Sequence, residues 1–150
     1  RSQVQETLHR CLYQACSLPQ QVPTFDMHLQ AGNFYRLDDP LQTCSAAAFS
    51  GRKLHALAGI GDPERFFQTL EGLGLAFSRH PFADHHAYKA ADLAFAGDGV
   101  LLMTEKDAVK CSQIAIIKND PRVWVVPVSA NIDDALAERI VEKLRGLTTA

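Results

Sequence analysis

The chain has 150 residues, of which 47% are hydrophobic and 21% are charged, and this composition predicts one compact domain with a small appendage. Fifteen basic and seventeen acidic residues leave a formal net charge of −2, without a long run of either sign. Because a protein that binds nucleic acid normally carries a basic footprint, we expect no nucleic acid partner. No apolar run approaches the roughly 20 residues that span a bilayer, so we expect no transmembrane segment.

The four cysteines show neither the CxxC spacing of a zinc site nor the density of a secreted disulfide scaffold. We therefore expect reduced thiols, as in a cytosolic protein. The chain begins with Arg1 rather than methionine, so we expect it to be a segment of a longer protein.

The first part of the chain predicts two small pieces. Apolar residues recur at helical spacing from Val4 to Ala15 and stop before Pro19, which indicates an amino-terminal helix and linker over residues 1–22. Residues 25–29 and 34–37 are short strand-like runs, and turn residues lie between them. This pattern favours a β-hairpin within a connecting segment, residues 23–52, that also holds a short helix.

From Lys53 onward, short apolar runs alternate with helical stretches, which is typical of βα units on a parallel sheet. We expect strands at 54–58, 75–79, 100–103 and 123–128. Pro127 indicates an edge position or a strand end for the last of them. The predicted fold class is therefore α/β: a four-stranded, mainly parallel sheet over residues 53–150, with helices on both faces, preceded by a short β-hairpin.

Residues typical of helix ends mark the predicted helices of this region. Asp62 and Pro63 are an N-cap and a first helical residue, and Gly74 predicts the end of that helix. Thr104 with Asp107 three residues later resembles a capping box, and one helix is expected to run from there through Ile117. Two further helices are predicted: a short helix over residues 90–96 and a final helix capped by Asn131.

Three polar loops follow predicted strands: residues 59–63, 81–88 and 104–107. Because the carboxyl ends of parallel strands lie at one edge of the sheet, where ligands bind in open α/β folds, these loops predict a site. The alternative is that they are helix caps, which are polar in every βα loop.

Asp84, His85 and His86 stand out in the second loop. Histidine titrates near neutral pH, so an Asp–His pair on a loop suits proton transfer or metal binding, although loop histidines are also often solvated bystanders. Adjacent histidines point in different directions on an extended backbone, so His85 and His86 are expected to have different roles. For the same reason they rarely reach one ion, and we expect no metal site here.

The other two loops carry weaker signals. Gly59 and Gly61 fit a tight turn into a helix, or a helix amino terminus that faces an anion. Lys106 lies in the first turn of its helix, where a positive charge opposes the helix dipole. A phosphate or carboxylate partner would explain it.

Three motifs in order, LAGIGDPERFF at residues 57–67, FADHH at 82–86 and MTEKDAVKC at 103–111, closely resemble the carboxyl-terminal part of the tetraacyldisaccharide 4'-kinase family. The resemblance runs from about Met27 to the final helix. It implies a P-loop kinase that phosphorylates the 4' hydroxyl of a lipid A disaccharide precursor at the cytoplasmic face of the inner membrane of Gram-negative bacteria.

The resemblance also assigns roles. It implies that an amino-terminal P-loop domain, the partner of this chain, binds most of the Mg and ATP, and that the fragment alone is inactive and binds neither tightly. It implies that this part closes over the active site. His85 would pair with an aspartate of the other domain to activate the sugar hydroxyl, with Asp84 beside it.

Two other readings stay open. Asp-His-His after a strand is also the signature of DHH phosphoesterases, which use manganese, although those enzymes need further metal-binding aspartates on earlier strands. A non-catalytic α/β docking module is the second alternative.

Overall fold

The computed structural model describes residues 24–146. One compact unit comprises Leu29–Ala130, and the described residues outside it, 24–28 and 131–146, belong to a second unit. The amino-terminal helix expected between Val4 and Ala15 lies outside the described residues. The candidate site is in the Leu29–Ala130 unit.

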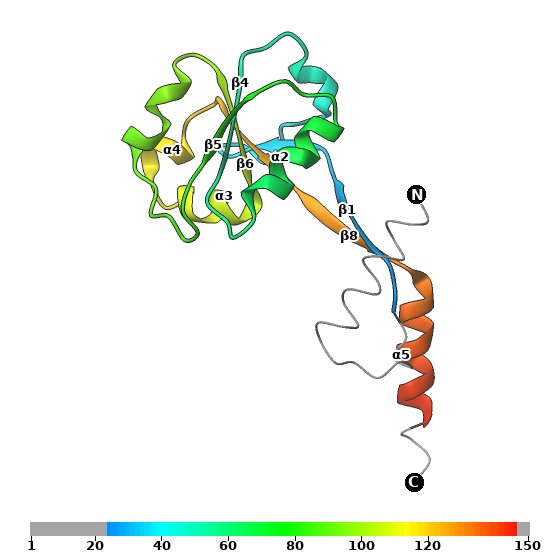
Figure 1. Ribbon diagram of the computed structural model, residues 1–150. Coiled ribbons are helices and arrows are strands. Elements are labelled where there is room, and N and C mark those ends of the chain that lie inside the picture. The colour runs from blue at the N-terminus through cyan, green and yellow to red at the C-terminus, as the bar shows by residue number, and fades with distance from the viewer. Residues whose placement is uncertain (1–23, 147–150) are drawn as a thin grey trace. The chain divides into compact units, whose positions relative to one another are not determined.

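The Leu29–Ala130 unit is built on a six-stranded sheet with the strand order β3-β2-β7-β6-β4-β5 (Figure 1). The strands are β2 (Phe34–Arg36), β3 (Thr43–Cys44), β4 (Leu54–Ala58), β5 (Ser78–Pro81), β6 (Val100–Thr104) and β7 (Val123–Val126). The four strands β5, β4, β6 and β7 are parallel neighbours, which confirms the α/β class and the parallel sheet. Strands β2 and β3 extend it by antiparallel pairing.

The expected β-hairpin is wrong. Strand β1 (Met27–Ala31) pairs with β8 (Val128–Ile132) in a separate two-stranded sheet, whereas β2 pairs with β3 and β7. The Gly32 N–H donates to the Pro127 carbonyl at 2.9 Å, so the segment expected to reverse the chain passes alongside Pro127 instead. Turn residues permit a reversal, but the choice of strand partner depends on distant segments.

Pro127 separates β7 from β8, as expected of a residue without an N–H to donate. It marks a strand end and not a sheet edge, because β7 lies between β2 and β6. The two β-strands at the actual edges are β3 and β5.

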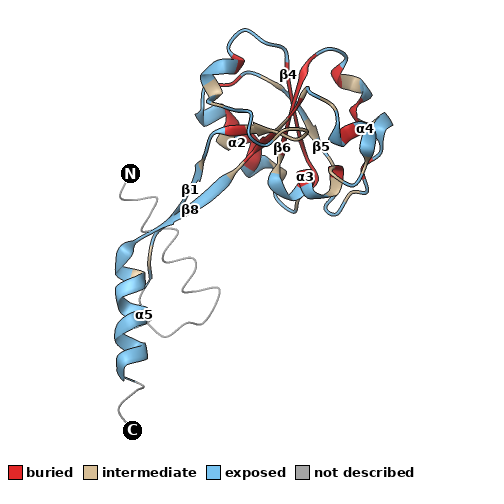
Figure 2. Ribbon diagram, turned by 180° about the vertical axis from the view of Figure 1, so that it is seen from behind, coloured by how far each residue is buried: buried red, intermediate tan, exposed pale blue. Residues whose placement is uncertain are grey.

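Helices cover both faces of the sheet, as predicted. On one face, Phe66, Phe67 and Leu70 of α2 (Pro63–Gly72) pack in one cluster with alternate residues of β4, namely Leu54, Ala56 and Ala58. The opposite face is covered by η2 (Ala90–Ala96), α3 (Glu105–Cys111) and α4 (Ala115–Lys118). Every residue of β4 is buried, so this strand lies at the centre of the core (Figure 2). The remaining 3-10 helix, η1 (Ala46–Phe49), precedes β4.

Two helix predictions need correction. The helix after Thr104 ends at Cys111, and a second short helix, α4, begins at Ala115. The final helix, α5 (Asp134–Gly146), begins later than expected, because Asn131 and Ile132 still belong to β8. Asp133, rather than Asn131, accepts a hydrogen bond from the backbone of the first turn, from the Ala135 N–H.

Other local predictions are confirmed. The Asp62 carboxylate accepts a hydrogen bond from the Arg65 N–H, and Pro63 is the first residue of α2. Gly74, with φ +77°, follows the helix end in the left-handed conformation that favours glycine. Gly97, with φ +57°, likewise ends η2.

A pair of histidines lies on the face of the sheet that η2, α3 and α4 cover. His55 on β4 is buried, and its Nδ1 is 3.0 Å from Nε2 of His80 on β5. The His80 ring stacks on Phe95 with 3.6 Å between ring centroids. Burial, together with the charge of Lys53, lowers the pKa of His55, and burial followed by the charge of His55 lowers the pKa of His80.

We therefore expect the free energy of unfolding to fall when the pH drops below the ordinary histidine pKa of about 6.5. Below that pH the unfolded chain binds protons that the native pair does not, so the full stability is present above it and is lost as the pH decreases. The slope cannot exceed about 1.4 kcal/mol per pH unit for each histidine. Chemical denaturation across this pH range measures it.

The matched variants are His80→Gln, which retains a hydrogen-bonding side chain but cannot titrate, and His28→Gln, which removes an exposed histidine. His80→Gln should flatten the dependence of stability on pH, and His28→Gln should not. An unchanged slope in His80→Gln would contradict this account.

Candidate active site

The order of the strands brings the three polar loops together. Strand β4 lies between β5 and β6 and is parallel to both, so the loops that follow these strands leave the same edge of the sheet. The Gly59 N–H donates to the Asp107 carboxylate at 3.1 Å, which links the first and third loops. Lys106 Nζ lies 3.7 Å from Asp84 Oδ1, which links the second and third.

Asp84 and His85 lie at the surface of this edge. The His85 side chain is 76% exposed, and its Nε2 lies 3.5 Å from Asp84 Oδ2. The other carboxylate oxygen accepts the His85 backbone N–H at 3.0 Å. His85 has φ +59°, a left-handed conformation that is uncommon for residues other than glycine, and strained residues of this kind cluster at functional sites. The imidazole is therefore accessible to a bound molecule.

His86 has a different environment, as the sequence predicted for two adjacent histidines. Its Nε2 is 2.8 Å from Asp92 Oδ2, and its ring packs against Phe82 and Tyr88. The hydrogen bond from His86 lowers the pKa of the Asp92 carboxyl. Because Asp92 also accepts the Lys89 N–H, His86 connects the loop to the start of η2. These contacts stabilise the conformation of the loop.

The two glycines of the first loop lie against the other two loops. A Cβ atom on Gly59 would be 2.7 Å from the Tyr88 hydroxyl and 3.2 Å from Asp107 Oδ1, so no side chain fits there. A Cβ atom on Gly61 would be 3.6 Å from Asp84 Oδ2, which is ordinary contact. Gly59 therefore allows the loops to approach one another closely, whereas the space around Gly61 would accept a Cβ atom.

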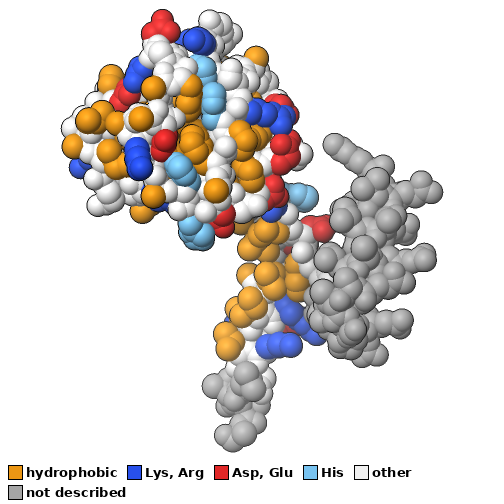
Figure 3. All heavy atoms as spheres, turned by 60° about the vertical axis from the view of Figure 1, so that its left-hand side comes forward, with side chains coloured by type: hydrophobic (Ala, Val, Ile, Leu, Met, Phe, Trp, Pro, Cys, Tyr) orange, Lys and Arg blue, Asp and Glu red, His pale blue; other side chains and the backbone are white. Residues whose placement is uncertain are grey.

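Lys106 is exposed on the first turn of α3, beside Asp84. A side chain with a terminal ammonium at this position can contact an anion that binds over the loops. In Figure 3, histidine, basic and acidic side chains are visible at the surface of the same unit.

Sequence reasoning missed the centre of the site, which is buried. It treated Asp107 as a helix cap, and the Thr104 hydroxyl does accept the Asp107 N–H at 3.1 Å. The Asp107 carboxylate is fully buried, however, and contacts Lys110, whose Nζ is 3.1 Å away. The available signals were the pairing of an aspartate with a lysine three residues later, and a glycine-rich loop that needs a partner.

Tyr88 and Cys111 lie next to this buried carboxylate. The Tyr88 hydroxyl has no hydrogen-bond partner among residues 24–146, and burial followed by the charge of Asp107 raises its pKa. Burial also raises the pKa of the Cys111 thiol to about 12. At neutral pH the Cys111 thiol is therefore protonated and is not a nucleophile.

Within residues 24–146, no group of three or more histidine, cysteine, aspartate or glutamate side chains could hold a metal ion. No helix in the same range is long and apolar enough to cross a bilayer.

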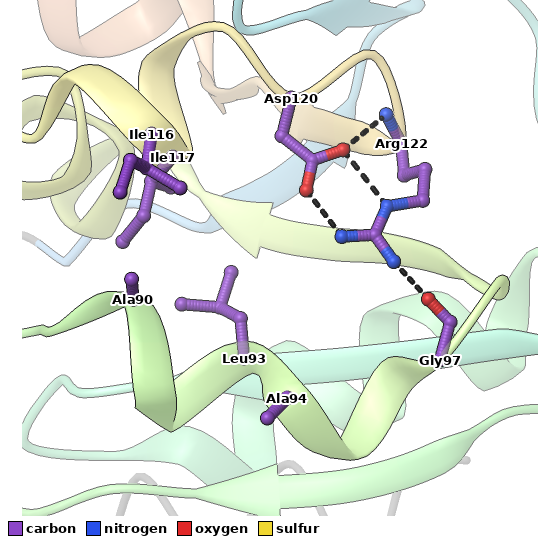
Figure 4. A pocket seen from close by; sticks show the side chains of 8 residues that line it. All are labelled: Ala90, Leu93, Ala94, Gly97, Ile116, Ile117, Asp120 and Arg122. Carbon is purple, nitrogen blue, oxygen red and sulfur yellow. Dashed lines mark hydrogen bonds and ion pairs between the residues drawn. The ribbon is translucent and has the colours of Figure 1, made fainter.

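A small pocket of about 180 Å³ lies at the opposite edge of the sheet (Figure 4). Leu93, Ile116 and Ile117 contribute apolar walls, and the Asp120–Arg122 ion pair lines its polar end. Because Gly97 precedes β6 and Arg122 precedes β7, this pocket is at the amino ends of the strands. It is separate from the loops that carry Asp84 and His85.

Comparisons with known proteins identify the family of the chain. A family model described as tetraacyldisaccharide-1-P 4'-kinase matches residues 3–145. A tetraacyldisaccharide 4'-kinase from Dechloromonas aromatica is 55% identical over 134 residues, which cover 89% of this chain and 39% of that protein. One from Herminiimonas arsenicoxydans is 53% identical over 112 residues, covering 73% of this chain and 32% of that protein.

Among solved structures, the fold is similar to that of LpxK from Aquifex aeolicus, crystallised in complex with ATP. The TM-score is 0.58 at 19% sequence identity, and the match covers 87% of this chain and 40% of that one. The chain thus spans less than half the length of the relatives that it matches. Because the family model matches nearly its whole length, the chain belongs to the tetraacyldisaccharide 4'-kinase family.

Proposed function

We propose that the full-length protein containing this chain transfers the γ-phosphate of ATP to the 4' hydroxyl of a tetraacylated lipid A disaccharide precursor. The observation that supports this most is the family match over residues 3–145, together with relatives named for that activity. The remainder of the protein, an amino-terminal P-loop domain, binds magnesium and ATP.

In this proposal the chain closes over the active site and contributes His85. The imidazole, oriented by Asp84 at 3.5 Å, helps to accept the proton of the 4' hydroxyl as its oxygen attacks the γ-phosphorus. The new oxygen–phosphorus bond forms as the bond between the γ-phosphorus and the bridging oxygen breaks, and ADP leaves. Exposure of His85 at the loop edge gives the hydroxyl access to the ring.

Lys106 assists as a cation at the same edge. It lies 3.7 Å from Asp84, so it can neutralise an anionic group of a bound substrate next to the Asp84–His85 pair. The reaction takes place at the cytoplasmic face of the bacterial inner membrane, where the lipid substrate is found.

His85→Ala in the full-length protein should lower kcat by about 10²- to 10⁴-fold, because it removes a general acid–base group. His86→Ala should change kcat little and reduce thermal stability, because it removes the hydrogen bond between His86 and Asp92 that joins the loop to η2. The exposed His28 provides the matched control, His28→Ala. Turnover is measured as ATP-dependent phosphorylation of the tetraacylated disaccharide 1-phosphate.

Near-normal turnover in His85→Ala, with the fold intact, would remove the catalytic role from this chain. Manganese-dependent hydrolysis of phosphodiesters by the wild-type protein, without kinase activity, would instead support the DHH phosphoesterase alternative.

Lys106→Met should lower kcat/KM by about tenfold, which is the loss expected when one charge-assisted contact to a bound anion is removed. Lys118→Met removes another exposed lysine, on α4 and away from the three loops, and should leave kcat/KM unchanged. The two variants are compared in the same assay at matched ionic strength. Equal effects of the two substitutions would show that Lys106 has no specific contact with the substrate.

A further inference from the structure

The Asp107 carboxylate has no part in the mechanism above, yet it is fully buried behind the reacting loops. It accepts hydrogen bonds from the Thr104 hydroxyl at 2.8 Å and from Lys110 Nζ at 3.1 Å, in addition to the Gly59 N–H. Burial of a charged pair costs free energy that its mutual attraction often does not recover. A buried charged network of this kind is better suited to holding a specific geometry.

The geometry that it holds is that of Gly59. Asp107 accepts the Gly59 N–H, and Lys110 Nζ donates to the Gly59 carbonyl at 2.9 Å, so both backbone groups of this residue are bound by side chains of α3. The Tyr88 hydroxyl lies 2.7 Å from the position that a Cβ of Gly59 would occupy. Gly59 is therefore held on several sides, and the loop that it begins has a defined position.

From Gly59 the constraint continues to the Asp84–His85 loop. The Ala83 carbonyl lies 3.4 Å from the position that a Cβ of Gly59 would occupy, and the Phe82 N–H donates to the Ala58 carbonyl at 2.8 Å. The Asp84 carboxylate is next to Gly61, two residues after Gly59, with Oδ2 3.6 Å from the position that a Cβ of Gly61 would occupy. A shift of residues 59–61 would displace Asp84 and, with it, His85.

The same carboxylate also anchors the loop that carries Lys106. Asp107 follows Lys106 directly, and its side chain is buried while that of Lys106 is exposed. The Thr104 hydroxyl both accepts the Asp107 N–H and donates to its carboxylate. Asp107 therefore contacts two of the three loops directly and the third through Gly59.

We infer that Asp107 is a positioning residue for phosphoryl transfer, which acts through Gly59 and Asp84 to place His85, with Lys110 as its partner. This inference rests on the proposed role of His85. A displacement of about 1 Å in a catalytic group can cost about 100-fold in rate, so a network without contact to substrate can control turnover.

The test is a double-mutant cycle in the full-length protein with ATP and the tetraacylated disaccharide 1-phosphate. Asp107→Asn keeps the size and an acceptor oxygen but removes the charge that holds Lys110. We expect it to lower kcat by about 10- to 100-fold with a KM for ATP within about twofold of wild type. In a His85→Ala background the same substitution should lower kcat by less than about twofold, because the group it positions is gone.

Asp120→Asn is the matched control, since Asp120, whose side chain is only 15% exposed, also belongs to an ion pair, with Arg122, at the opposite edge of the sheet. Both substitutions should reduce stability, because each breaks an ion pair, but Asp120→Asn should not change kcat. The inference would be overturned by equal losses of kcat in Asp107→Asn and Asp120→Asn. It would also be overturned if Asp107→Asn lowered kcat as much in the His85→Ala background as in the wild type.

The outcomes separate the inference from the proposed function. If His85→Ala lowers turnover and Asp107→Asn does not, the positioning role is wrong and the proposed function stands. If His85→Ala does not lower turnover, the proposed catalytic role fails, and the positioning role fails with it.

A second pair of variants covers the case in which Asp107→Asn does not fold. Lys110 is partly exposed, so Lys110→Met keeps the aliphatic stem and loses the donor to Gly59 and Asp107, while Lys110→Arg retains a charged donor. Lys110→Met should lower kcat when His85 is present and change it little in the His85→Ala background. Lys110→Arg should recover part of the rate. Full activity in Lys110→Met would overturn the inference.

Discussion

The close approach of α3 to the backbone at the end of β4 is the constraint on which the rest of the site depends. Gly59 has no space for a side chain, and its N–H and carbonyl groups are bound by Asp107 and Lys110. Because β4 is buried on both faces and lies between β5 and β6, its carboxyl end is the one point that all three polar loops share. Fixing that point positions all three loops.

The site thus has a buried layer and an exposed layer with different chemistry. The buried layer contains Asp107, Lys110 and the Tyr88 hydroxyl, and its groups are arranged around backbone. The exposed layer contains Asp84, His85 and Lys106, whose side chains are 43%, 76% and 54% exposed and are therefore accessible to a bound molecule. Rigid support below and accessible groups above are what a catalytic loop requires, since a reacting group must be oriented before the substrate arrives.

Much of the fold could be predicted because it depends on local signals. Asp62 and Pro63 begin α2, and Gly74 follows its end, because caps and left-handed glycines act within a few residues of the chain. The failures were non-local. The partner of β1 is β8, about 100 residues away, and the helix that was expected to continue through Ile117 is interrupted after Cys111. Neither the pairing nor the interruption has a strong signature within its own segment.

The sequence by itself determined the α/β class, the three loops at the carboxyl ends of the strands, and the different environments of His85 and His86, because periodicity and residue chemistry are local properties. Only the tertiary structure decided that Asp107 is more than a helix cap. Thr104 and Asp107 are three residues apart and could be paired by inspection, whereas Gly59 and Asp107 are 48 residues apart. Their hydrogen bond exists because parallel pairing of β4 and β6 places the ends of both strands side by side.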